Sequence, residues 1–139
     1  MSKRAVVDTG PLVAIVRDGE TAHERCVAAL KDLKTPLLSC WPVLTEAAWL
    51  LRNDSGGVRA LGALVRSGAV KLVPLDEVAL AWMIEFMDRY ATLGAQLADA
   101  AVMYLAEVEN IDVVFTLDRR DFSVYRTTTG RALTILPHP

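Results

Sequence analysis

The sequence predicts an α/β sandwich in which helices cover both faces of a central, mostly parallel β-sheet. Two observations carry this prediction: short apolar runs typical of buried strands alternate with helical patterns, and 53% of the 139 residues are apolar. Strands separated by helices need crossover connections, which set the strands parallel and place the helices on the faces. Typical domains hold about 100–150 residues, so we expect one domain over residues 1–139.

In the first half of the chain, turn-forming and helix-starting residues divide the apolar segments. An apolar run ends at Asp8, and Gly10-Pro11 then opens a helix, because proline is tolerated in a first helical turn. Pro42 starts a later helix, which the segment 53–57 stops. We expect strands over 5–7 and 36–40 and helices over 10–16, 21–33, 42–52 and 58–66.

The second half of the chain continues this alternation. Pro74 marks the end of a strand, and Asp76 is a favourable N-cap for the long helix that follows. The segment 97–108 is nearly all apolar and predicts a further helix. We expect strands over 70–74, 112–117 and 133–136 and helices over 76–90 and 97–108.

Charge and composition limit the classes of function. The formal net charge of −2 excludes binding of nucleic acid by a strongly basic whole surface, but not an enzyme whose basic residues form one stripe. The uncharged apolar runs are much shorter than the ~18–20 residues that cross a bilayer, and no secretory signal is recognisable. Cys26 and Cys40 lack metal-ligand spacing, so we expect two reduced thiols in a cytoplasmic protein.

Two acidic residues come directly after predicted strands. Asp8 follows the run 5–7, and Asp118 follows the run 112–117. Ligands of open parallel sheets bind beyond the carboxyl ends of the strands, so both residues are candidates for a site. Taken singly, each is also typical of a helix cap or a turn, and position alone leaves both interpretations open.

Two further acids, Glu46 and Asp99, lie in apolar helical segments. Neither has a Lys or Arg three or four positions away on its helix. A carboxylate in an apolar setting is normally paired, protonated or bound to a metal. Two simpler explanations stay open: Glu46 lies on a solvent-facing helix edge, and Asp99 is a favourable charge at a helix N-terminus.

Considered together, the four acids suggest one metal site. Carboxylates about 5 Å apart repel by roughly 3 kcal/mol per pair at an effective dielectric constant near 20. A cluster of four therefore requires protons or cations, and Mg²⁺ and Mn²⁺ are the divalent cations that prefer oxygen ligands. Such a site carries out phosphoryl chemistry by activating water and neutralising charge on the phosphate.

Other types of active site find little support in the sequence. His23 lies on an amphipathic helix and His138 near the C-terminus, which argues against RNA cleavage by a pair of histidines. The chain has neither of the glycine-rich phosphate-binding motifs GxGxxG and GxxxxGK[ST]. The segment after Asp8 lacks the second Asp of a phosphatase loop, and zinc lacks a set of His or Cys ligands.

Four segments carry a family resemblance: VVDTGPL at 6–12, TE at 45–46, LADA at 97–100 and TLDRRDF at 116–122. In this order they resemble the PIN-domain nucleases and, within them, the VapC-type toxins of bacterial toxin–antitoxin pairs. The resemblance covers nearly the whole chain. It implies a three-layer α/β/α sandwich with a central parallel sheet.

The same resemblance implies a metal-dependent endoribonuclease. The family's four acids map onto Asp8, Glu46, Asp99 and Asp118, which would bind one or two Mg²⁺ or Mn²⁺ ions. Asp8 and Asp99 would be the principal ligands, and the other two would complete the site directly or through water. PIN nucleases cut single-stranded RNA and leave 5′-phosphate and 3′-hydroxyl ends. VapC-like proteins usually form homodimers and are held inactive by an antitoxin, so both partners are implied here.

Residues next to the four acids complete the expected site. Thr9 and Thr116 are candidates for hydroxyls that orient a carboxylate or a water molecule. Asp121 competes with Asp118 for the place of the fourth acid, and the position directly after the strand favours Asp118. Four arginines are candidates for contacts to RNA phosphates, although ordinary solvent-exposed arginine explains each equally well. They are Arg52, Arg119, Arg120 and Arg126.

Large apolar side chains at helical spacing are expected to lie mostly in the core, although some of them could instead form a dimer face or an antitoxin groove. These side chains are Trp49, Trp82, Met83, Phe86, Met87 and Tyr90.

Two rival functions remain open. One is a catalytically silent PIN-like interaction module. The other is an acyl-phosphate site of the receiver or phosphatase type, which also places Asp at strand ends. Such sites usually have a Lys after a late strand, whereas the last lysine here is Lys71.

Overall fold

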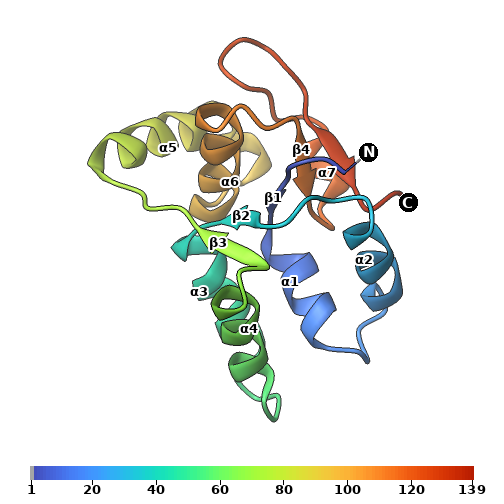
Figure 1. The fold of residues 1–139 in the computed structure, drawn as a ribbon. Coiled ribbons are helices and arrows are strands. Elements are labelled where there is room, and N and C mark those ends of the chain that lie inside the picture. Colours follow the sequence, from blue (N-terminus) through green and yellow to red (C-terminus); the bar gives the residue numbers. More distant parts are fainter. Residues whose placement is uncertain (1) are drawn as a thin grey trace.

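Helices cover both faces of a five-stranded sheet in the computed structural model, which describes residues 2–139 (Figure 1). Every strand pairing is parallel, and the strand order is β3-β2-β1-β4-β5. The strands are β1 (Val6–Val7), β2 (Leu37–Ser39), β3 (Val70–Leu72), β4 (Val113–Phe115) and β5 (Thr134–Leu136). The predicted α/β sandwich with a parallel sheet is confirmed.

The helices form the two outer layers. They are α1 (Thr9–Val16), α2 (His23–Leu30), α3 (Trp41–Leu50), α4 (Gly57–Arg66), α5 (Glu77–Arg89), α6 (Leu97–Val108) and α7 (Arg119–Phe122), with a 3-10 turn, η1 (Ala91–Leu93), between α5 and α6. Helix α6 packs on β1, β2 and β4 and is covered by α5, whereas α1 contacts α2, α3 and α4. In Figure 1, α5 and α6 lie on one side of the sheet and α1, α2 and α4 on the other. Within residues 2–139, no helix has the length and apolar character needed to cross a bilayer.

The topology creates a switch point beside the central strand. From β1 the chain moves outward through β2 to β3, and it then returns across the sheet to β4 on the other side of β1. Ligand crevices of open α/β sheets form where the strand order reverses in this way. The carboxyl ends of β1 and β4 are therefore the first place to search for a site.

Expectation and structure agree best for the most buried helix. Helix α6 has the predicted bounds, 97–108, and most of its side chains are buried. Helix α2 is shorter than the predicted 21–33, because residues beyond it turn to pair with the N-terminal segment: the Lys3 N–H donates to the Asp32 carbonyl at 3.1 Å. The short helix α7 was not predicted. Its start depends on the Asp118 carboxylate, which accepts the Asp121 N–H at 3.1 Å.

Candidate active site

A cavity of about 450 Å³ opens at the carboxyl edge of the sheet. Five carboxylates face it from separate parts of the chain: Asp8 follows β1, Glu46 lies on α3, Asp99 on α6, and Asp118 and Asp121 at α7. The structure thus brings all four predicted acids to one cavity, together with the alternative fourth acid. The remaining lining residues are Thr9, Gly10, Leu50, Gly94, Gln96, Thr116 and Leu117.

Strand pairing brings the first and last of these acidic segments together. β1 and β4 are neighbours, with Val7 opposite Phe115, and the Asp8 N–H donates to the Phe115 carbonyl at 2.9 Å. Immediately beyond, Gly10 in the first turn of α1 lies against Leu117, where a Cβ atom would approach the leucine side chain to 3.2 Å. Glycine therefore allows the close contact between the α1 turn and the segment that follows β4.

The Thr116 hydroxyl links two of the acids. It donates to Oδ2 of Asp8 at 2.8 Å and accepts the backbone N–H of Asp118 at 3.0 Å. Thr116 is fully buried, so this bridge is shielded from water. The other threonine named from the sequence behaves differently: the Thr9 hydroxyl donates to the Val43 carbonyl of α3 at 3.4 Å and ties α1 to α3.

Asp99 is oriented from two directions. It lies in the first turn of α6, where Oδ2 accepts the Gln96 N–H at 3.3 Å. The same oxygen accepts the hydroxyl of Tyr125 at 3.0 Å. Sequence reasoning did not single out Tyr125. It lies in an irregular segment after α7, where no periodicity marks which side chains turn inward.

Burial is the main cause of the perturbed acidity in the cavity. It raises the pKa of Asp8 to about 6, against the lowering effect of the Thr116 hydrogen bond, and the charges of Asp99 and Glu46 add to the rise. Burial also raises the pKa of Asp99, and partial burial together with the neighbouring Asp118 raises that of Asp121. Within residues 2–139, none of these carboxylates forms an ion pair with Lys or Arg.

The donor set of the cavity fits a hard divalent cation. Every titratable group that lines it is a carboxylate, and the other side-chain donors are hydroxyl and amide oxygens. The carboxylates line the cavity without converging on one point: in the described chain, no three Asp, Glu, His or Cys side chains are grouped as a metal ion requires. Mg²⁺ is commonly held by only one or two carboxylates and several waters, so its binding does not require three grouped protein ligands.

Comparison with known proteins gives this arrangement its family. The model of the PIN domain matches residues 5–127, a range that includes all five cavity carboxylates. The chain belongs to the PIN domain family. A curated relative, Ribonuclease VapC26 of Mycobacterium tuberculosis (strain ATCC 25618 / H37Rv), is 25% identical over 134 residues, which are 95% of this chain and 99% of the relative.

Solved structures share the fold of this PIN domain. VapC20 of Mycobacterium tuberculosis, a Sarcin-Ricin loop cleaving toxin, matches with a TM-score of 0.76 at 18% identity and covers 84% of this chain and 91% of its own. FitAcB from Neisseria gonorrhoeae matches with a TM-score of 0.65 at 17% identity, covering 96% of each chain. The resemblance to PIN domains and VapC proteins that the sequence suggested is therefore confirmed.

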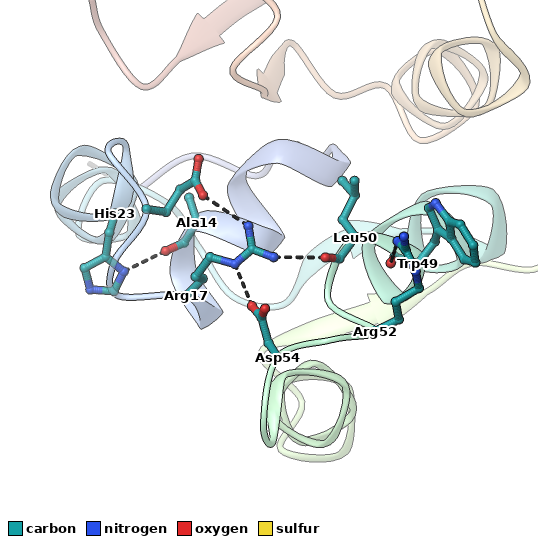
Figure 2. Close-up of polar contacts among 8 residues, drawn as sticks. Ala14, Arg17, His23, Trp49, Leu50, Arg52 and Asp54 are labelled. Carbon is teal, nitrogen blue, oxygen red and sulfur yellow. Dashed lines mark hydrogen bonds and ion pairs between the residues drawn. The ribbon is translucent and has the colours of Figure 1, made fainter.

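The arginines near the PIN-domain cavity differ in what they bind. Arg119 donates to the Pro137 carbonyl at 2.8 Å and so ties α7 to the C-terminal segment, and Arg126 donates to the Ser123 carbonyl at 2.7 Å. Arg120 is exposed. Arg52 is exposed as well, and its guanidinium stacks 3.7 Å from the centre of the Trp49 ring (Figure 2). None of the four lines the cavity itself.

An apolar groove adjoins the cavity of the PIN domain. It runs along α3 and the start of α6, with Trp41, Trp49 and Leu97 in its walls, and it shares Glu46 with the cavity. Trp49 is the exception among the large apolar side chains expected mostly in the core: it lies in this groove and is 62% exposed. Helix α3 buries the face that carries Val43 and Ala47, and a residue two positions beyond Ala47 points away from that face.

The other side chains predicted for the core either belong to it or pack against it. Met83 and Phe86 are buried, and Trp82, Met87 and Tyr90 pack against the core while partly exposed. Cys26 and Cys40 are buried free thiols, and burial raises the pKa of Cys40 to about 11. Neither cysteine is among the residues that line the cavity.

Proposed function

We propose that this protein is a divalent-metal-dependent endoribonuclease of the VapC kind, which cleaves single-stranded RNA in the cytoplasm as the toxin of a toxin–antitoxin pair. One observation carries the proposal: a PIN domain brings five carboxylates, none of them in an ion pair with Lys or Arg of residues 2–139, to a single cavity at the switch point of its sheet. The relationship to Ribonuclease VapC26 supports RNA as the substrate.

In this proposal, Asp8 and Asp99 are the principal ligands of Mg²⁺ or Mn²⁺, and Glu46 and Asp118 complete the site directly or through water. When bound, the ion activates a water molecule and neutralises charge on the scissile phosphate. The chain itself orients the ligands: the Thr116 hydroxyl donates to Asp8 and in turn accepts the Asp118 N–H. Asp121 faces the same cavity and is the alternative to Asp118.

Contacts to RNA are proposed for arginines whose guanidinium groups face solvent. Arg52 and Arg120 are exposed and lie next to acid-bearing elements, Arg52 just beyond α3 and Arg120 within α7. The guanidinium groups of Arg119 and Arg126 donate to backbone carbonyls, and that of Arg52 donates to the Trp49 carbonyl at 2.8 Å. Arg52 and Arg120 are preferred because they are more exposed than Arg119 and Arg126. Guanidinium groups at this edge would offset the negative charge of the cavity for an incoming phosphate.

Two protein partners belong to the proposal. A cognate antitoxin is supported by the structural likeness to VapBC2 from Rickettsia felis, solved bound to a DNA fragment from its promoter (TM-score 0.63, 13% identity, 97% of this chain and 98% of that one). A homodimer is supported by the apolar groove, whose indoles Trp41 and Trp49 are both more than half exposed. Light scattering on the intact protein and on Trp49→Glu tests the dimer, which we expect the variant to dissociate.

Incubation of purified protein with unstructured and structured RNA tests the central proposal. We expect Mg²⁺ or Mn²⁺ to support cleavage of the unstructured RNA to products with 5′-phosphate ends, and EDTA or Asp8→Asn to abolish it. Cleavage that survives both treatments contradicts a metal mechanism at this cavity. Binding of RNA with no cleavage under any divalent ion indicates the catalytically silent module instead.

A further inference from the structure

We propose that Tyr125 is a positioning residue, whose buried hydroxyl sets the Asp99 carboxylate in the orientation that binds the ion. This inference rests on the proposed function, because it assigns a role within the same site. Tyr125 does not line the cavity, so it acts through Asp99 and does not touch RNA. Sequence reasoning did not find it.

The hydrogen bonds to Asp99 show how this orientation arises. The Tyr125 hydroxyl and the Gln96 N–H both donate to Oδ2, at 3.0 and 3.3 Å. Two donors that approach one oxygen from different elements stop the carboxylate from rotating about its Cβ–Cγ bond. Within residues 2–139 no donor of the protein reaches Oδ1, so that oxygen remains available for a cation. Donors of this kind, behind a ligand, tune how well it holds a metal.

The Tyr125 ring is itself held in place by an aromatic cluster. Tyr125 is fully buried, and the rings of Phe86, Tyr90 and Phe122 surround it with centroid distances of 4.9, 5.0 and 5.0 Å. The packed ring directs its hydroxyl at Asp99, in the first turn of α6.

This aromatic cluster connects two acid-bearing elements of the cavity, α7 with its cap Asp118 and the start of α6 with Asp99. Phe122 ends α7, the helix that Asp118 caps, and Tyr125 reaches from there to Asp99 at the start of α6. The arrangement parallels that at Asp8, whose Oδ2 accepts the Thr116 hydroxyl at 2.8 Å. Each of the two proposed principal ligands thus receives one hydroxyl from a buried residue far away in sequence.

Direct measurement of metal binding tests this role. Isothermal titration of the intact protein with Mn²⁺ would compare wild type, Tyr125→Phe and the matched control Tyr90→Phe. Both variants remove one hydroxyl from the same cluster, and both hydroxyls make a 3.0 Å hydrogen bond, but only Tyr125 donates to an acid. We expect Tyr125→Phe to weaken Mn²⁺ binding about 10-fold and Tyr90→Phe to change it by less than about twofold.

A second pair of variants separates positioning from packing. In an Asp99→Asn background, Tyr125→Phe should cause no further loss of Mn²⁺ affinity, because the carboxylate it positions is already gone. Equal losses in Tyr125→Phe and Tyr90→Phe, or unchanged affinity in Tyr125→Phe while wild type binds Mn²⁺ and cleaves RNA, overturn the role of Tyr125 and leave the proposed function intact. A wild type that binds no Mn²⁺ and cleaves no RNA overturns both.

Discussion

Carboxylates occur in two contrasting environments in this molecule. Around Arg17, at the end of α1, they are neutralised: the guanidinium donates to Asp54 at 2.6 Å, to Glu20 at 3.4 Å and to the Leu50 carbonyl at 2.9 Å (Figure 2). In the cavity, the donors that residues 2–139 supply to Asp8 and Asp99 are all hydroxyl or backbone N–H groups. The same chemical group is satisfied in one region and left with uncompensated charge in the other.

The difference indicates which region serves stability and which serves chemistry. The Arg17 cluster closes the C-terminal end of α3, where the Leu50 carbonyl has no partner within the helix. Its neighbours raise the pKa of the Arg17 guanidinium, chiefly through the hydrogen bond to Asp54. The cavity, by contrast, raises the pKa of Asp8 and Asp99, chiefly through burial, and so disfavours their charged forms. Uncompensated charge of this kind is typical of a functional site.

The largest effect that we expect is a difference in RNA-cleavage rate between a variant in the cavity and a variant in the Arg17 cluster. Asp8→Asn should lower the rate of RNA cleavage by about 100-fold or more, since a catalytic metal supplies several kcal/mol of transition-state stabilisation. Asp54→Asn is the matched control, because it makes the same chemical change in the Arg17 cluster and should leave the rate within about twofold. Initial rates on one unstructured RNA, with Mn²⁺ near saturation, measure both. Similar losses in the two variants contradict the assignment of the cavity.

Stability should respond in the opposite direction. The folded-state pKa of Asp8, about 6, lies above its ordinary value of 3.8, so Asp8 favours the folded state below pH 4 and this contribution is lost as the pH rises through 6. In EDTA at pH 8, Asp8→Asn should therefore raise the free energy of unfolding by about 1–3 kcal/mol, and near pH 4 the gain should vanish. Urea denaturation at both pH values measures this. A gain that does not depend on pH argues against the buried charge as its cause.

The acids that line the cavity could be named from the sequence because the signals that mark them are local. Asp8 follows a strand, and Glu46 and Asp99 lie among apolar residues with no cation in reach on their own helices. The parallel sheet then brings the strand ends together, as periodicity suggested. These features depend on chain order and on the spacing of apolar residues, both of which are visible without a structure.

Other features depend on tertiary contacts that no local pattern encodes. Tyr125 reaches Asp99 from an irregular segment 26 residues away, and Arg17 reaches Asp54 across 37 residues. Trp49 shows the limit of periodicity itself: its helix is apolar on several sides, so composition alone did not show that the face with Val43 and Ala47 would be the buried one. The short helix α7 was missed because its start depends on a single capping carboxylate, that of Asp118.

A smaller effect concerns the contribution of the Arg17 cluster to stability. Asp54→Asn should lower Tm by about 1–4 °C, because a partly exposed ion pair contributes little to stability. The loss should shrink at 1 M NaCl, which screens exposed charges. Thermal unfolding at low and high salt measures it. By comparison, the stabilisation by Asp8→Asn in EDTA should persist at high salt, since the Asp8 carboxylate is buried and its destabilisation comes chiefly from burial.

The smallest effect tests whether arginines outside the two regions bind RNA. Arg17 already binds two carboxylates, whereas Arg52 and Arg120 are exposed. In an Asp8→Asn background, which keeps the RNA intact, replacing both Arg52 and Arg120 with Ala should reduce the slope of log affinity against log salt by about 0.7 for each phosphate that the variant no longer neutralises. Arg17→Gln should leave the slope unchanged, because the charge of Arg17 is already paired with the carboxylates of Glu20 and Asp54. An unchanged slope in the double variant shows that Arg52 and Arg120 do not contact RNA phosphates. A reduced slope in Arg17→Gln would instead place Arg17 among the residues that contact RNA.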